Sequence, residues 1–383
     1  MPLASKLPQV GTTIFTEMTQ LALQHGAVNL GQGFPDFEGP EALRAALTEA
    51  MASGANQYAP MPGVLALREQ VARLAFERFG RRVDPGSEVT ITSGGTEALF
   101  AALAAIVSPG DEVILLDPCY DSYDPAIRLQ GGIPVHVPLR PSDFSVDWDR
   151  VRAALSPRTR AILVNTPHNP TGTILSAADL EALAALTRDT EILVISDEVY
   201  EFITFDGARH QSVLRHPELA ARSFVIGSFG KTFHCTGWKV GYAVAPAALS
   251  AEFRKVHQYL TFATFHPAQV ALAKVLAEDP AHLEGLPAFY QARRDRFRAL
   301  LAGARFRLWP VDGAYFQIAD YSAYGLEDDR AFCHRLVREA GVAAIPLSPF
   351  SEAPVAGRLI RFCFAKTDAT LEAAAERLTA FGA

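Results

Sequence analysis

The stretch SFGKTFHCTGWKVGY, residues 228–242, follows a short apolar segment, residues 224–226, and runs into a second one, residues 240–244. Both segments are typical of buried strands, whereas the stretch between them contains two lysines, three glycines and several hydroxyl side chains. An α/β protein places reactive groups in such loops, because the edge of the sheet holds them rigidly. The stretch therefore predicts an α/β fold with a functional site at this loop.

Lys231 is the candidate reactive group of this loop. A lysine that is desolvated near other cations has a lowered pKa and becomes a nucleophilic amine. Lys239, further along the same loop, could supply the second cation or bind an anion, and Ser228 could donate a hydrogen bond to that anion. Taken alone, a Ser-x-Gly-Lys motif is more often an ordinary solvated loop. The rest of the chain has to decide between the two interpretations.

The composition predicts a folded chain with a large core. Of the 383 residues, 49% are hydrophobic and 20% are charged, which argues against disorder and leaves room for two domains. The net charge is −7 and the basic residues are scattered, so no nucleic-acid partner is expected. The sequence has no N-terminal signal segment and no apolar run of membrane-spanning length. We therefore expect a cytoplasmic protein without a membrane partner.

The cysteines and histidines show no metal-binding pattern. The four cysteines are far apart and form no CxxC pair: Cys119, Cys235, Cys333 and Cys363. The ten histidines include no HExxH motif and no cluster at the spacing of metal ligands. No metal site is expected.

Alternating strands and helices begin near residue 88 and predict a mainly parallel sheet. Apolar strands are expected at residues 89–92, 113–116, 161–164, 192–195, 224–226 and 240–244. An uninterrupted apolar strand is typical of a parallel sheet that is buried on both faces. Helices are expected at residues 40–52, 64–79, 98–107, 176–186, 249–258 and 267–303. A smaller α+β domain is indicated by later strands and helices, at residues 306–308, 314–318, 328–339, 359–364 and 370–381.

Polar side chains follow several of these strands and would meet at one edge of the sheet. Gly95 and Thr96 open the helix after residues 89–92, where free N–H groups at the positive end of the helix dipole favour phosphate. Tyr120, after residues 113–116, could stack on a flat ligand.

Two charged residues in apolar surroundings need partners. Asp197 follows the apolar strand at residues 192–195, and burying its carboxylate requires a cation from a ligand or from a protein arginine. Arg361 lies within another apolar strand and needs a carboxylate from the protein or from a substrate. Asn169 and Tyr200 add an amide and a phenol near the same edge.

This combination matches the requirements of one cofactor, pyridoxal 5′-phosphate. Its aldehyde requires a lysine, its phosphate requires a helix N-terminus, and its ring nitrogen requires an anion that keeps it protonated. Lys231, the turn at Gly95 and Thr96, and Asp197 would supply these three groups. Pyridoxal phosphate is therefore the expected cofactor.

The chain resembles the fold-type I, class I/II aminotransferases, in the branch that holds methionine aminotransferases and kynurenine–oxoglutarate aminotransferases. The resemblance covers nearly the whole length and is carried by residues 6–8, 29–37, 165–172, 196–200, 228–242 and 359–366. Residues 55–61 and 254–262 are most similar to bacterial methionine aminotransferases. The resemblance implies a large cofactor-binding domain over residues 41–280, with a mainly parallel seven-stranded sheet flanked by helices. Residues 1–40 would belong to a smaller α+β domain with residues 281–383.

The resemblance also implies a role for each candidate residue. Lys231 would hold the cofactor covalently and, once free, would move a proton at the substrate's Cα. Asp197 would pair with the ring nitrogen, and Tyr200 would complete the catalytic set. The other cofactor contacts would be stacking by Tyr120, hydrogen bonds from Asn169 and Tyr200 to the phenolic oxygen, and phosphate binding by Gly95, Thr96, Ser228 and Lys239. Relatives often have arginine where this chain has Lys239, so only a point charge is available here.

In this family, the tyrosine that matches Tyr58 reaches the phosphate of the neighbouring subunit, which implies a homodimer with shared active sites. Arg361 would bind the substrate's α-carboxylate, assisted by Asn169 and the backbone at Gly33. The pocket for the substrate's side chain would be lined by phenylalanines: Phe15, Phe34 and either Phe262 or Phe265. The motifs contain no second arginine for a distal carboxylate, which argues against an aspartate-specific enzyme.

The expected function is transfer of the amino group of an apolar or aromatic L-amino acid, methionine favoured, to a 2-oxo acid by a ping-pong mechanism. The alternative within the same fold is a kynurenine–oxoglutarate aminotransferase with cysteine-conjugate β-lyase activity. A ligand-sensing domain of a transcription regulator would follow a DNA-binding module, whereas the aminotransferase pattern starts here within the first dozen residues. A NAD-dependent enzyme is disfavoured because the GxG at residues 31–33 leads into a proline rather than a helix.

Overall fold

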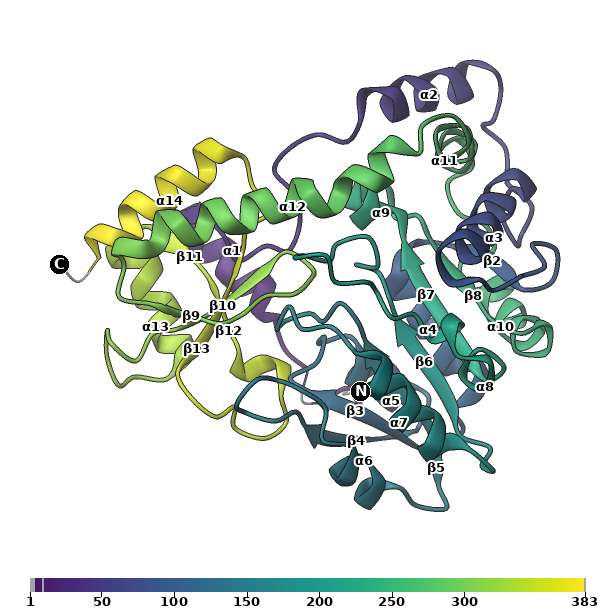
Figure 1. Cartoon of the computed structure of the whole chain (residues 1–383), viewed down its shortest axis with the longest axis horizontal. Helices are drawn as coiled ribbons and strands as arrows, with labels where there is room; N and C mark the ends of the chain where they lie inside the picture. Colours follow the sequence, from purple (N-terminus) through teal and green to yellow (C-terminus); the bar gives the residue numbers. More distant parts are fainter. Residues whose placement is uncertain (1–3, 9, 382–383) are drawn as a thin grey trace.

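The computed structural model describes residues 4–8 and 10–381, and the centre of this described part is a seven-stranded sheet (Figure 1). The strand order is β2-β8-β7-β6-β5-β3-β4. The strands are β2 (Val89–Thr92), β3 (Glu112–Asp117), β4 (Ile133–Pro138), β5 (Thr159–Asn165), β6 (Leu193–Asp197), β7 (Ser223–Ser228) and β8 (Gly241–Val244). Neighbouring strands from β7 to β4 are parallel, whereas β8 is antiparallel to β7 and β2. The predicted mainly parallel seven-stranded sheet is confirmed.

Both faces of this sheet are buried. Along β3, Val113 and Leu115 belong to one hydrophobic core, whereas Ile114 and Leu116 belong to the other. Successive side chains of a strand point to opposite faces, so a strand between two layers of helices has to be apolar throughout. This arrangement explains the uninterrupted aliphatic runs in the sequence.

Two layers of helices cover the sheet. α4 packs against α10 and β7 on one face, whereas α11 packs against α2 and α3. The helices of this part are α2 (Glu41–Ala52), α3 (Leu65–Phe79), α4 (Gly94–Ile106), α5 (Tyr123–Leu129), α6 (Trp148–Ala154), α7 (Ala177–Thr187), α8 (Pro217–Ala220), α9 (Phe229–Thr232), α10 (Ala247–Leu260) and α11 (His266–Glu278). α7 begins where the sequence predicts, because Ser176 and Asp179 form a capping box at its N-terminus.

The C-terminal part of the chain forms a separate four-stranded antiparallel sheet in the order β12-β13-β10-β9. Its strands are β9 (Arg307–Leu308), β10 (Phe316–Asp320), β12 (Ile345–Pro346) and β13 (Leu359–Cys363). The helices of this part are α12 (Ala281–Leu300), α13 (Asp329–Arg335) and α14 (Asp368–Ala380), and α1 (Ile14–His25) of the N-terminal segment packs against β11 and β12. α12 runs from the side of α11 to α14, against which it packs (Figure 1).

The N-terminal segment joins the C-terminal part through a pair of short parallel strands, β1 (Val28–Asn29) and β11 (Val342–Ala343). This pairing supports the assignment of residues 1–40 and 281–383 to one smaller domain, and the boundaries stay a prediction. Residues 1–3, 9 and 382–383, which that prediction includes, lie outside the described part. No helix in residues 4–8 and 10–381 is long and apolar enough to cross a membrane.

Several expected elements differ in the structure. The single helix expected over residues 267–303 is two helices, α11 and α12, because Asp279 and Pro280 interrupt it. The helix expected from residue 98 already begins at Gly94. The sequence pattern predicts no strand at β4, an edge strand whose exposed and buried positions do not alternate. Short helical turns lie at Val213–Arg215, Thr236–Trp238, Leu301–Gly303, Leu336–Ala340 and Ser348–Phe350.

Candidate active site

A cavity of about 260 Å³ lies where the C-terminal ends of β5, β6 and β7 meet the start of α4. The sheet register pairs Asn165 with Asp197, so the ends of these strands are level. Most of the residues predicted from sequence line this cavity: Phe15, Gly33, Phe34, Gly95, Thr96, Tyr120, Asn169, Asp197, Tyr200, Ser228, Lys231, Lys239 and Arg361. The fold therefore brings together residues of both sheets and of the N-terminal segment.

Tyr58, Phe262 and Phe265 lie outside this cavity. The ring centres of Tyr58 and Phe262 are 5.2 Å apart, and Tyr58 and Phe265 line a separate surface depression. Tyr58 is 81% exposed, which is high for a large aromatic side chain. Within a single chain none of the three reaches the cavity, so a role at such a site requires a second subunit.

One end of the cavity is suited to an anion. A Cβ at Gly95 would lie 2.9 Å from a side-chain carbon of Val199, so there is no room for a side chain at this position, where the start of α4 lines the cavity. A Cβ at Gly94 would lie 3.4 Å from the Lys239 Nζ, which places this ammonium group at the start of α4. The hydroxyl side chains of Thr96 and Ser228 also line the cavity. Helix N–H groups, two hydroxyls and an ammonium group together suit a phosphate.

Asp197, at the end of β6, is 4% exposed. Its carboxylate accepts hydrogen bonds from the Tyr123 hydroxyl at 2.6 Å and from the Val199 N–H at 3.3 Å. Burial raises the pKa of Asp197 to about 6, although both hydrogen bonds and the nearby Lys231 oppose the rise. Within the described part of the chain, no basic side chain forms an ion pair with this carboxylate. A protonated ring nitrogen in the cavity would supply the missing positive charge.

Lys231 lies in α9, directly after β7. Its Nζ donates to the Gly33 carbonyl at 3.3 Å and lies 5.6 Å from the centre of the Tyr200 ring. Burial lowers the pKa of Lys231 to about 8, and the charges of Lys239 and Arg361 add to this effect. The amine is therefore half neutral near pH 8, as a covalent reaction with a carbonyl group requires.

The lowered pKa of Lys231 predicts its reactivity. In competitive labelling with a trace of acetic anhydride, the reactivity of Lys231 in the cofactor-free protein should rise with pH and level off above about pH 8, since only the neutral amine reacts. The control is Lys274, whose hydrogen bond to Glu49 raises its pKa above the ordinary 10.5. The reactivity of Lys274 should therefore still be rising at the pH where that of Lys231 has levelled off. Mass spectrometry of the two peptides gives both curves. Coinciding curves would contradict the desolvation of Lys231.

Arg361, on β13, is 1% exposed and has no carboxylate partner among the described residues. Its Nη1 donates to Asn169 Oδ1 at 2.6 Å and its Nη2 donates to the Gly31 carbonyl at 3.0 Å. Its Nε has no hydrogen-bond partner in residues 4–8 and 10–381. The guanidinium group lies 4.1 Å from the centre of the Phe316 ring. A buried cation without a counter-ion is costly, and a ligand carboxylate would supply the missing charge.

The loop at residues 31–34 closes the cavity beside Arg361. The Gly33 carbonyl accepts a hydrogen bond from the Tyr315 hydroxyl at 2.8 Å. The Phe34 carbonyl accepts one from the Lys366 ammonium at 2.7 Å. Donors from the C-terminal part therefore fix the loop that carries the predicted substrate contacts.

Sequence reasoning missed Tyr123, Phe316 and Lys366. Tyr123 lies three residues after Tyr120, but an aromatic residue in such a helix is usually a core residue. Lys366 is a buried lysine whose acceptor lies 332 residues earlier in the chain, and no local pattern indicates such a contact. A lysine three residues after an apolar strand is the only local signal that could have marked it.

Comparisons with known proteins agree with this fold. The family model "Aminotransferase class I and II" matches residues 25–378, and the chain belongs to this family. Methionine aminotransferase of Escherichia coli (strain K12) is 55% identical over 374 residues, which cover 98% of this chain and 97% of that protein. A solved structure of an Escherichia coli methionine aminotransferase has a TM-score of 0.97 and 54% identity, and covers 99% of both chains.

Two other relatives have different names. A probable N-succinyldiaminopimelate aminotransferase of Mycobacterium tuberculosis (strain ATCC 25618 / H37Rv) is 44% identical over 387 residues, which cover 98% of this chain and 97% of the relative. Kynurenine–oxoglutarate transaminase 1 of Homo sapiens is 34% identical over 409 residues, which cover 98% of this chain and 97% of the human protein. The predicted family and fold class are confirmed, and the chain is an aminotransferase.

Proposed function

We propose that this enzyme uses pyridoxal 5′-phosphate to transfer the amino group of an apolar L-amino acid, methionine favoured, to a 2-oxo acid in a ping-pong reaction. The observation that carries the proposal is Arg361, a buried cation without a carboxylate partner in the described part of the chain. Phe15 and Phe316, which lie beside its guanidinium group, line the same cavity. The site thus offers one carboxylate-binding group next to an apolar wall.

The residues around the cavity fit pyridoxal phosphate. The start of α4, together with Ser228 and Lys239, would hold the phosphate, and Tyr120 would stack on the ring. The side-chain amide oxygen of Asn169 already accepts a hydrogen bond from Arg361. Its NH₂ group is therefore left to donate, with the Tyr200 hydroxyl, to the ring's phenolic oxygen.

The chain's own groups would then perform three tasks. When bound, the cofactor supplies an electron sink that stabilises negative charge at the substrate's Cα. Asp197 would stay ionised beside the positive ring nitrogen, because an adjacent cation lowers a carboxyl pKa. Lys231, whose pKa is lowered to about 8, would accept and return the Cα proton near neutral pH. Arg361 would orient the substrate through a two-pronged contact with its α-carboxylate.

Aspartate is expected to be a poor donor. The basic side chains that line the described cavity are Lys231, Lys239 and Arg361. The proposal assigns the first two to the cofactor and the third to the α-carboxylate, so a second substrate carboxylate would be buried without a cation. The kynurenine alternative has less support, because its human namesake is 34% identical and the methionine enzyme is 55% identical.

Steady-state kinetics with L-methionine, L-kynurenine and L-aspartate, each with the same 2-oxo acid acceptor, tests the substrate class. kcat/KM for methionine should exceed that for aspartate by about 100-fold or more, the effect of leaving a carboxylate unpaired in an apolar pocket. A higher kcat/KM for kynurenine than for methionine would favour the alternative function. Aspartate as the best donor would contradict the proposal.

We also propose that the enzyme is a homodimer with shared active sites. The support is a group of exposed aromatic side chains: Tyr58, which is 81% exposed, makes an edge contact with Phe262 and lines the same surface depression as Phe265. In such a dimer Tyr58 would reach the phosphate of the neighbouring site. A cytoplasmic location also stays a proposal, and the four free cysteines fit a reducing compartment.

A further inference from the structure

The segment at residues 348–352 joins the two parts of the molecule. The Cys119 N–H, just beyond the end of β3, donates to the Phe350 carbonyl at 2.7 Å. Asp117 Oδ2 accepts from the Glu352 N–H at 2.8 Å and from the Ser351 hydroxyl at 3.2 Å. At the other end, the N–H and hydroxyl of Ser348 each bond to the carboxylate at the start of α13 at 2.7 Å. We call residues 348–352 the bridging loop.

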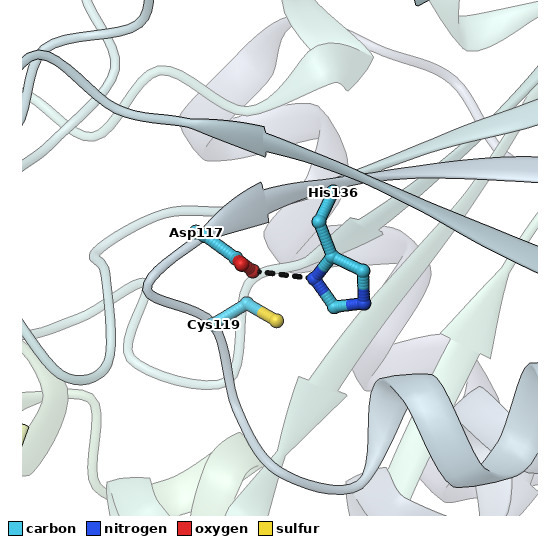
Figure 2. A group of neighbouring side chains, drawn as sticks. All are labelled: Asp117, Cys119 and His136. Atoms are coloured by element: carbon cyan, nitrogen blue, oxygen red, sulfur yellow. Dashed lines mark hydrogen bonds and ion pairs between the residues drawn. The ribbon is translucent and has the colours of Figure 1, made fainter. Parts of the chain in front are cut away.

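His136, on the neighbouring strand β4, contacts Asp117, the residue whose carboxylate binds the bridging loop. Figure 2 shows its ring reaching from β4 to the Asp117 carboxylate. The Nδ1–Oδ1 distance is 2.8 Å, and the other ring nitrogen, Nε2, lies 3.1 Å from Asp124 Oδ2. Since a carboxylate only accepts hydrogen bonds, both nitrogens are donors and the ring is an imidazolium. Burial opposes this charge, but the hydrogen bonds to Asp117 and Asp124 outweigh burial and raise the pKa of His136 to about 9.

This cluster is an ion-pair network rather than a metal site. The ligand-type atoms of Asp117, Cys119 and His136 lie within 4.8 Å of one another, a proximity that sequence spacing did not reveal. A metal ion would require a lone pair on His136 and a thiolate at Cys119. Both His136 nitrogens face carboxylates, and burial beside Asp117 raises the pKa of the Cys119 thiol. The donor set therefore favours a proton over a metal ion.

The bridging loop supports the substrate-binding side of the cavity. Phe350, which is fully buried, makes an edge contact with Phe15, with ring centres 5.7 Å apart. The Arg361 guanidinium lies 5.3 Å from the centre of the same Phe350 ring. Phe15 and Arg361 line the cavity, whereas Phe350 lies behind them. Phe350 therefore packs against both residues.

We propose that His136 is a positioning residue for substrate binding: it fixes Asp117, which holds the bridging loop and thereby Phe350 against Arg361 and Phe15. The inference deepens the proposed function and rests on it, since it assigns the substrate carboxylate to Arg361. Tyr120 directly follows Cys119, so the turn that anchors the loop also carries the proposed platform for the cofactor ring.

Loss of the His136 cation would leave Asp117 buried with its negative charge uncompensated. The hydrogen bonds that Asp117 accepts from Ser351 and Glu352 would weaken as the carboxylate rearranges or takes up a proton. The charged and titratable groups that face His136 are Asp117 on β3, Asp124 on α5 with its partner Arg128, Glu352 on the bridging loop, and the Cys119 thiol. Because the folded-state pKa of His136 is raised, its stabilising charge is fully present below pH 6.5 and is lost as the pH rises through about 9.

The test compares His136→Leu, which removes the charge, with His136→Arg, which keeps a cation that can donate to both carboxylates. The control is Arg188→Leu, which removes an exposed ion pair with Glu218 elsewhere in the large domain. The first readout is amide hydrogen exchange in the cofactor-free protein. Exchange of the Glu352 N–H should be faster in His136→Leu, and should be restored in His136→Arg and unchanged in the control. Unchanged exchange in His136→Leu would overturn the proposal.

The second readout is calorimetric binding of 3-phenylpropanoate to the holoenzyme, since this molecule has a carboxylate and an apolar side chain but no amino group. His136→Leu should bind it about 3- to 30-fold more weakly, with a similar rise in the KM for methionine and little change in kcat, as for residues that act through a neighbour. The wild type, but not His136→Arg, should lose affinity as the pH rises through about 9. The absorption of the bound cofactor should not change.

The outcomes separate the two proposals. An equal loss of ligand affinity, cofactor binding and thermal stability, without rescue by His136→Arg, would show a merely structural role and overturn the inference. A wild type that binds no 3-phenylpropanoate and converts no apolar amino acid would overturn the proposed substrate class instead, whatever the exchange data show for the bridging loop.

Discussion

Replacing Lys231 with alanine is expected to lower the transamination rate by at least about 10⁴-fold, because covalent attachment of the cofactor and proton transfer at Cα both use its amine. Folding should not suffer. The amine makes a single hydrogen bond with the described residues, to the Gly33 carbonyl at 3.3 Å. Its pKa is lowered, so the folded state does not favour the charged form. The measurements are kcat/KM for methionine and the melting temperature of the cofactor-free protein.

The matched control for this substitution is Lys255→Ala. Lys255 is exposed and pairs with Glu252 on the surface of α10, so its loss should leave activity unchanged. A Lys231→Ala enzyme within tenfold of the wild type would exclude Lys231 as the cofactor lysine. A variant that is inactive because it is unfolded would be recognised by its melting temperature.

The same variant tests the shared active site. If Tyr58 serves the neighbouring subunit, a mixed dimer of Lys231→Ala and Tyr58→Ala chains contains one intact site. Random reassociation of equal amounts should then restore about a quarter of the wild-type sites, since half of the dimers are mixed and each has one intact site of two. If the mixture is no more active than the average of the two separate variants, Tyr58 does not contribute to the neighbouring subunit's active site.

Replacing Arg361 with leucine should lower kcat/KM for methionine by about 10²- to 10³-fold, the cost of losing a buried charge-assisted contact to a carboxylate. Without substrate, the guanidinium is a buried cation whose hydrogen-bond partners among the described residues are neutral, namely the Asn169 side chain and the Gly31 carbonyl. An apolar side chain at such a position is often neutral or stabilising. The expected signature is therefore a large loss of activity with an unchanged or higher melting temperature.

The control is Arg361→Lys, which keeps the charge but loses the two-pronged geometry and should fall between the wild type and Arg361→Leu. An Arg361→Leu enzyme with the wild-type KM would show that the substrate carboxylate binds elsewhere. A fall in melting temperature that accounts for the loss of activity would assign Arg361 to the fold alone.

The sequence predicts the centre of the fold because its determinants are local. The inner strands are continuous aliphatic runs, and Ser176 with Asp179 marks the start of α7 within four residues. β4 could not be predicted, since it lies at the edge of the sheet and carries prolines and His136 among its apolar residues. The break between α11 and α12 depends on Asp279 and Pro280 inside an otherwise periodic pattern.

Some residues of the candidate site can also be predicted from local sequence, whereas others cannot. Lys231, Asp197 and Arg361 are recognisable because a charged group beside or within an apolar strand needs a partner. Phe350 and His136 are not, since their importance comes from contacts with residues far away in the sequence. Phe350 meets Phe15 near the other end of the chain, and His136 meets Asp117 only because two strands pair. Such contacts become visible when the chain is folded.

A single turnover of the holoenzyme with L-methionine, without any 2-oxo acid acceptor, tests the central claim most directly. The proposal predicts that the cofactor's visible absorbance is lost and that about one equivalent of the 2-oxo acid of methionine forms per cofactor site, as a ping-pong half-reaction requires. L-aspartate should leave the spectrum nearly unchanged over the same time. A holoenzyme that forms no 2-oxo acid from methionine, or that reacts faster with aspartate, would contradict the proposed function.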